Sequence, residues 1–142
     1  MNHPVNDVAR FHRKFCHAAP ERPMTVAEPG AWKFRRALIY EEFEEVMEAM
    51  DQHNMAKTAK ELCDLIYVCL GWFVDFGWPF KLWWNKVQQS NMSKRKNPNG
   101  GKPIKHSDFI DVNVKEIARY QLTEIGSIQP PVSVGNAFIE GV

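Results

Sequence analysis

Four carboxylates on two neighbouring stretches of the chain could do chemistry together. Glu42 and Glu45 are three positions apart, and so are Glu61 and Asp64. On a helix, side chains three positions apart project from the same face. Two such helices packed antiparallel would point all four carboxylates at one another, and a fold tolerates such repulsion mainly where a cation binds between the charges. Hard oxygen ligands suit Mg²⁺, for which Mn²⁺ can substitute, and make a poor zinc site.

The second carboxylate pair carries most of this argument. A single ExxE pair more often marks a solvated helix face than a binding site. Glu61 and Asp64, however, stand beside Leu62 and Leu65 at the start of the most hydrophobic stretch of the chain. Aspartate is also a poor residue for the middle of a helix. A carboxylate pair at the edge of a core helix therefore indicates a metal site.

The register of the first pair is open, because Glu41 and Glu44 are also three positions apart. We favour Glu42 and Glu45, since Glu45 directly precedes the apolar Val46. A di-iron bundle is the obvious competing carboxylate site, but it needs Glu-x-x-His on two of its helices. No histidine of this chain follows a glutamate by three positions.

Size and composition limit the class of protein further. The 142 residues fit one compact domain, and 44% hydrophobic residues are enough for a core. The net charge of +1 gives no overall field for nucleic acid or an anionic membrane, so we expect neither as a partner. The longest apolar run is too short to cross a bilayer, and the N-terminal residues contain no apolar signal segment. We therefore expect a cytoplasmic protein with three reduced cysteines.

Hydrophobic periodicity predicts an all-α protein. Helices are expected at residues 5–18, with Asn6 as a cap, and at residues 32–52, 56–76 and 79–92. Their short connections favour antiparallel neighbours in a four-helix-type bundle. The expected core residues are Val8, Phe11 and Phe15 on the first helix, Ile39, Phe43, Val46 and Met50 on the second, and Leu62, Leu65, Ile66, Cys69 and Phe73 on the third.

The character of the chain changes after Ser93. The segment KRKNPNGGKP is basic and rich in glycine and proline, which predicts a loop or a hairpin around Asn99-Gly100. A short helix is expected within VNVKEIARYQLTEI. We therefore divide the chain into a helical domain, residues 1–98, and a less regular C-terminal extension, residues 99–142. The extension is expected to pack on the bundle or on a partner subunit.

Two further groups of residues could bind a substrate. Asn91, Lys94 and Arg95, at the expected end of the fourth helix, offer a polar and cationic clamp for phosphate oxygens, although cations there also complement the helix dipole. A glycine-rich phosphate loop is absent from the sequence, so side chains and metal ions would have to hold phosphate.

Aromatic residues supply the second group. Phe11 and Trp32 could stack on a base, with His12 beside them, although Phe11 also fits the core and an exposed histidine needs no special role. The other tryptophans are expected mainly in the core or at a subunit interface: Trp72, Trp78, Trp83 and Trp84.

These motifs resemble the all-α nucleoside triphosphate pyrophosphohydrolases, which include the MazG-like proteins, dimeric dUTPases, dCTPases and phosphoribosyl-ATP pyrophosphohydrolases. The family signature is ExxE, a gap and ExxD, which here reads Glu42-Phe43-Glu44-Glu45 and Glu61-Leu62-Cys63-Asp64. The NMSK sequence at residues 91–94 is similar to the Asn/Lys pair of the family's next helix. The resemblance covers about residues 5–105, and the chain looks like small, often phage-encoded, single-domain members.

The resemblance implies Mg²⁺-dependent hydrolysis of a nucleoside triphosphate to monophosphate and pyrophosphate by a homodimer or homotetramer. It implies that Glu42, Glu45, Glu61 and Asp64 hold the metal, and that Glu42 or the adjacent Glu41 accepts a proton from the attacking water. The phosphates would be steadied by the cationic clamp of the fourth helix.

Substrate choice stays open at this point. Control of the deoxynucleotide pool is our first expectation, with a preference for a purine such as dGTP. Two alternatives remain, a phosphoribosyl-ATP pyrophosphohydrolase and a helical scaffold without catalysis. The location expected is the cytoplasm, which would be the host's cytoplasm for a phage-encoded protein.

Overall fold

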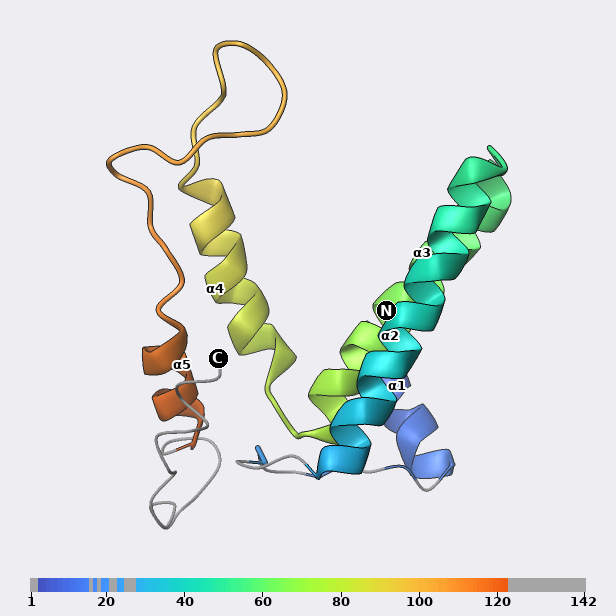
Figure 1. The fold of residues 1–142 in the computed structure, drawn as a ribbon. Coiled ribbons are helices and arrows are strands. Elements are labelled where there is room, and N and C mark those ends of the chain that lie inside the picture. Colours follow the sequence, from blue (N-terminus) through green and yellow to red (C-terminus); the bar gives the residue numbers. More distant parts are fainter. Residues whose placement is uncertain (1–2, 16, 18, 21–22, 25–27, 123–142) are drawn as a thin grey trace. The chain divides into compact units, whose positions relative to one another are not determined.

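The computed structural model describes residues 3–15, 17, 19–20, 23–24 and 28–122. Within these residues the chain forms five helices and no strand beyond one isolated bridge, so the predicted all-α class is confirmed (Figure 1). None of the described helices has the length and apolar character needed to cross a membrane. The helices are α1 (Pro4–Lys14), α2 (Pro29–Asp51), α3 (Met55–Asp75), α4 (Phe80–Met92) and α5 (Val114–Tyr120).

The helices fall into two compact units. The first unit, Met1–Trp78, contains α1, α2 and α3, and the second, Pro79–Val142, contains α4 and α5. In the first unit, α3 packs against both α1 and α2. The domain division expected from composition, after residue 98, stays a prediction.

The first two helices each begin at a proline. Helix α1 begins at Pro4, and the His3 side chain caps it by accepting a backbone hydrogen bond. The expected cap at Asn6 is therefore wrong. Helix α2 begins at Pro29, about a turn before the expected start at Trp32. Proline suits these positions because the first N–H groups of a helix have no partner within it.

A tight turn joins α2 to α3 and lays the two helices side by side, antiparallel (Figure 1). The backbone N–H of His53 donates to Met50 O (2.9 Å), and that of Asn54 donates to Ala49 O (3.1 Å). His53 lies in the left-handed region with a φ of 52°. The Asn54 side chain then caps α3 by accepting the N–H of Lys57 at 3.0 Å. The expected break after residue 52 is thus confirmed.

The apolar stripes are only partly buried. Val8 and Val46 are 1% and 4% exposed, as expected for core residues. Six other residues expected in the core are instead exposed: Phe11, Phe15, Phe43, Met50, Leu62 and Ile66. That prediction was wrong for these positions, because periodicity identifies an apolar face but not what covers it.

Charged groups take part of the core in place of these residues. Asp75 of α3 is buried and accepts a hydrogen bond from Arg35 Nε of α2. Its other oxygen lies 2.7 Å from Nδ1 of His12 on α1, so one carboxylate of α3 contacts both other helices of the first unit. Gly71 makes room for this arrangement, since a Cβ there would lie 2.5 Å from Nη1 of Arg35.

The second unit has its own contacts. Trp83 Nε1 of α4 donates to Gln121 Oε1 just after α5 (2.6 Å), and the N–H of Ile110 donates to Ser93 Oγ (2.9 Å). The backbones of Arg95 and Ile104 bond to each other, which confirms the predicted hairpin, and α5 confirms the short helix of the extension. The rest of the tail, residues 123–142, lies outside the described residues.

Substitution of Asp75 by asparagine tests the buried charge network. Asp75→Asn leaves the buried Arg35 guanidinium without its counter-charge, and we expect it to lower the free energy of unfolding by about 3 kcal/mol. Urea unfolding followed by circular dichroism measures the loss. The control is Asp7→Asn, which removes an exposed ion pair with Arg10 and should have a small effect. Equal losses in the two variants would contradict a central role for Asp75.

The turn between α2 and α3 gives a second prediction. His53→Gly removes the strain of a left-handed non-glycine residue, and after the entropic penalty of glycine we expect a net gain of about 0.5 kcal/mol in the free energy of unfolding. The control is Gln52→Gly, at a right-handed position where glycine should only destabilise. A loss of stability in both variants would rule out strain at His53.

Candidate metal centre

Three carboxylates gather between α2 and α3. Glu42, Glu45 and Glu61 each offer one oxygen, and these three oxygens lie within 4.8 Å of one another. Glu42 and Glu45 come from one face of α2, and the antiparallel turn brings Glu61 of α3 opposite them. Glu61 is only 4% exposed, so its carboxylate is almost entirely out of water.

Asp64, the fourth expected ligand, lies beside this group rather than in it. Its Oδ2 atom is 2.8 Å from Nζ of Lys60, one turn earlier on α3. Asp64 is nevertheless close enough to Glu42 for its charge to raise the pKa of Glu42. The structure thus brings together three of the four expected ligands and places the fourth next to them.

Charge repulsion makes the group a candidate cation site. The pKa of Glu42 is raised above its usual value, first by loss of hydration and then by the charges of Asp64 and Glu45. A divalent cation between these oxygens would remove the repulsion. The three residues of the group are all glutamates, so the donors are carboxylate oxygens alone, and this donor set fits Mg²⁺ or Mn²⁺.

The alternative pair of the first motif, Glu41 and Glu44, lies outside the glutamate group. Glu41 and Glu44 are both exposed, and neither belongs to the group of three glutamates. A base at Glu41 would therefore act from outside the group, whereas Glu42 lies in it.

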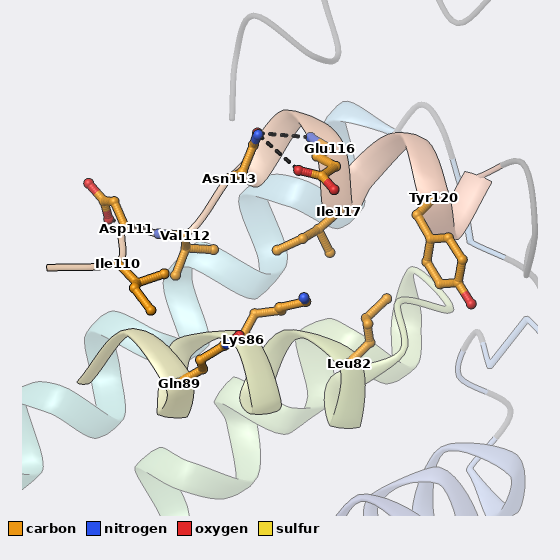
Figure 2. Close-up of a pocket in the computed structure, with 10 residues that line it drawn as sticks. All are labelled: Leu82, Lys86, Gln89, Ile110, Asp111, Val112, Asn113, Glu116, Ile117 and Tyr120. Carbon is orange, nitrogen blue, oxygen red and sulfur yellow. Dashed lines mark hydrogen bonds between the residues drawn. The ribbon is translucent and has the colours of Figure 1, made fainter. Parts of the chain in front are cut away.

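The residues expected to clamp phosphate belong to the second unit. Lys94 Nζ donates to Asn91 Oδ1 at 2.8 Å, so these two side chains already act as a pair. Arg95 Nη2 donates to Asp108 Oδ2 at 2.5 Å. A cavity of about 500 Å³ also lies in this unit (Figure 2). Its lining includes Lys86, Asn113 and Glu116 but none of the clamp residues.

The aromatic candidates lie in the first unit and differ in exposure. Phe11 is 42% exposed with its ring edge-on to Tyr67, and Trp32 is 52% exposed with its ring edge-on to Trp72. Both rings therefore present surface to a ligand. His12 is 2% exposed and contacts Asp75, which places it in the helix packing.

Sequence reasoning missed Lys60. This residue lies on α3 directly before Glu61 and contacts both Glu61 and Asp64. The signal was present, because a lysine four positions before an aspartate on a helix can reach it.

One comparison with known proteins shows the family of the chain. A sequence model described as phosphoribosyl-ATP pyrophosphohydrolase matches residues 8–91, more than half of the 142 residues. No curated protein matches the chain significantly. The helical fold and the match place the protein among the all-α nucleoside triphosphate pyrophosphohydrolases, the MazG-like superfamily. Within that superfamily, the chain belongs to the phosphoribosyl-ATP pyrophosphohydrolase family, whose members are pyrophosphohydrolases acting on nucleotides.

The raised pKa of Glu42 predicts how stability depends on pH. An acid whose pKa is higher in the folded state makes the fold less stable as pH rises from its ordinary pKa to the raised one, and the loss is complete above the raised pKa. We therefore expect Glu42→Gln, without divalent cations, to raise the melting temperature at pH 7, and the gain to disappear as pH falls through the Glu42 pKa. Glu44→Gln, at an exposed position on the same helix, is the control. A gain that is the same for both variants, or the same at every pH, would contradict repulsion within the group.

Proposed function

We propose that the protein hydrolyses the bond between the α- and β-phosphates of a nucleotide that carries a triphosphate, in a reaction that requires Mg²⁺. The observation that carries the proposal is the group of Glu42, Glu45 and Glu61 within 4.8 Å across two antiparallel helices. The match to a pyrophosphohydrolase family supports the reaction type independently.

In this proposal the carboxylates bind the metal ion, and one of them also accepts a proton. Glu42, Glu45 and Glu61 would hold the metal ion, with Asp64 next to them as a further ligand. When bound, Mg²⁺ neutralises charge on phosphate oxygens and lowers the pKa of a water molecule. Glu42, or Glu41 beside it, accepts the proton as the water oxygen bonds to the α-phosphorus. The bond from that phosphorus to the bridging oxygen breaks, and pyrophosphate leaves with the bond's electron pair.

Other side chains would position the substrate. Asn91 and Lys94, which share a hydrogen bond in the second unit, are by chemistry suited to phosphate oxygens, as is Arg95, and their part in binding the substrate stays a prediction. Phe11 and Trp32 offer exposed ring surface on which a base can stack.

Two substrate classes share this chemistry. The first is a deoxynucleoside triphosphate, with a purine such as dGTP preferred, in control of the nucleotide pool. The second is phosphoribosyl-ATP, which the description of the matching family favours directly. Both carry a triphosphate and release pyrophosphate, so the same residues serve either substrate. A scaffold without catalysis would have little reason to keep four carboxylates at this spacing.

An oligomer fits the surface of the first unit. Large apolar side chains of α2 and α3 that are at least 39% exposed include Tyr40, Phe43, Met47, Met50, Leu62 and Ile66. So many exposed apolar residues on two adjacent helices are typical of a surface that another protein chain covers. We therefore propose a homodimer or homotetramer that buries these residues.

Pyrophosphate release from a panel of nucleotides tests the function. The panel contains dNTPs, NTPs and phosphoribosyl-ATP, each with Mg²⁺, with Mn²⁺ and with EDTA. We expect metal-dependent release of pyrophosphate and a monophosphate, and a loss of about 100-fold or more in Glu61→Gln and Asp64→Asn. Glu44→Gln, which changes an exposed carboxylate outside the group, should stay near wild type.

The outcomes separate the alternatives. The ranking of the panel names the substrate class. Normal turnover by folded Glu61→Gln and Asp64→Asn would refute the metal-centre assignment. No release from any nucleotide, by folded protein, would favour a scaffold.

A further inference from the structure

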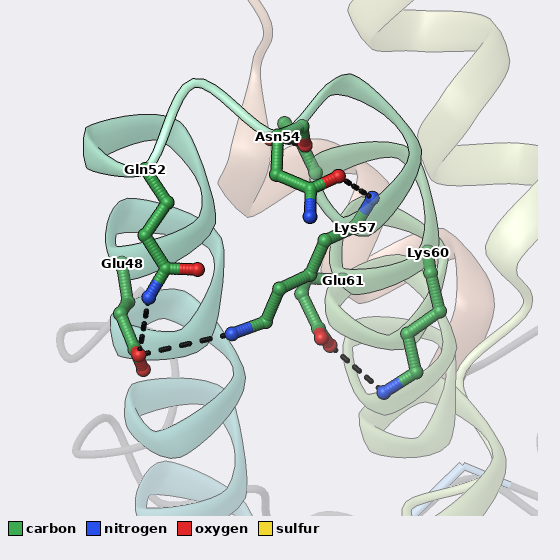
Figure 3. Close-up of polar contacts among 7 residues, drawn as sticks. Glu48, Gln52, Asn54, Lys57, Lys60 and Glu61 are labelled. Carbon is green, nitrogen blue, oxygen red and sulfur yellow. Dashed lines mark hydrogen bonds and ion pairs between the residues drawn. The ribbon is translucent and has the colours of Figure 1, made fainter.

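Lys60 bridges two carboxylates of the metal centre. Its Nζ atom lies 2.9 Å from Glu61 Oε2 and 2.8 Å from Asp64 Oδ2. Figure 3 shows the Lys60 side chain folding along α3 toward Glu61. The three residues occupy one turn of a single helix, so the contact needs no other element of the structure.

The two carboxylates that Lys60 contacts differ in their access to water. The side chain of Glu61 is 5% exposed, that of Asp64 is 41% exposed and that of Lys60 is 64% exposed. A nearly buried carboxylate needs a counter-charge, because burial removes its hydration. Lys60 supplies that charge from the solvent side. Because its side chain is largely exposed, the ammonium stays hydrated if the contact breaks.

A divalent cation needs the same carboxylates. Glu61 is one of the three residues whose oxygens lie within 4.8 Å of one another, and Asp64 lies beside them. Each contact that these carboxylates make with the Lys60 ammonium is one that they cannot fully offer to a metal ion. Two positive charges on the same carboxylates also repel each other.

We propose that Lys60 is a positioning residue that acts as a tethered counter-ion of the metal centre and is displaced when the divalent cation binds. The Lys60 ammonium holds Glu61 and Asp64 in place against their mutual repulsion, and it lowers metal affinity by the same contacts. The inference rests on the proposed function, because it assumes a metal at the glutamate group.

Lys57 provides a matched control on the same helix. Its Nζ atom lies 3.7 Å from Glu48 Oε1 of α2, and Glu48 is not part of the glutamate group. Figure 3 draws this ion pair as a dashed line. Lys57→Gln and Lys60→Gln therefore remove the same charge at neighbouring positions, and only Lys60→Gln frees the carboxylates of the metal centre.

The experiment measures Mn²⁺ binding to the full chain, without nucleotide, from the electron paramagnetic resonance signal of free Mn²⁺. For Lys60→Gln we expect Mn²⁺ affinity to rise roughly three- to fivefold. Lys57→Gln and Lys60→Arg, which keeps the charge, should stay near wild type, and Glu61→Gln should bind Mn²⁺ poorly. In EDTA, the melting temperature of Lys60→Gln should fall below that of Lys57→Gln.

Each result bears on a separate statement. Unchanged or weaker Mn²⁺ binding by Lys60→Gln, with weak binding by Glu61→Gln, overturns the displacement while the metal centre stands. Equal melting temperatures of the two lysine variants in EDTA overturn the positioning role. Wild-type affinity in Glu61→Gln, or no Mn²⁺ binding by any variant, overturns the metal centre itself and the proposed function with it.

Discussion

The buried carboxylate of Asp75 is the constraint on which the first unit depends. A charge inside a protein must be compensated, and here Arg35 of α2 supplies the opposite charge while His12 of α1 contacts the other carboxylate oxygen. The contact fixes which part of α2 lies against the end of α3, and Gly71 leaves space for the guanidinium. The same antiparallel packing brings Glu45, farther along α2, opposite Glu61, earlier on α3. The contacts of Asp75 and the glutamate group are thus two consequences of one helix register.

The group of three glutamates proposed to bind a metal is electrostatically unfavourable by itself. Burial and neighbouring carboxylates raise the pKa of Glu42, so its surroundings disfavour its charged form. Lys60 offsets part of the repulsion from one side of the group. Functional sites commonly sacrifice stability in this way, because the groups that bind a cation strongly are those that repel one another without it.

The sequence predicted the helices and the grouping of carboxylates better than it predicted the core. Turn residues and periodicity located the break after residue 52 and the hairpin near residue 100, since both depend on local backbone chemistry. Phe43 and Ile66 were expected in the core and are exposed, because an apolar stripe has the same pattern whether its own chain or another chain covers it. Arg35 and Asp75 were overlooked for the converse reason, because charged residues are rarely buried unless paired.

The sequence by itself determined the all-α class and the two carboxylate motifs, because helix formation and three-residue spacing are local properties of the chain. Only the tertiary structure decided that Glu42 and Glu45, rather than Glu41 and Glu44, meet Glu61. It also placed Asp64 beside the group rather than in it. The physical reason is that both registers are equally helical, and only the contact of α2 with α3 selects the face that turns inward.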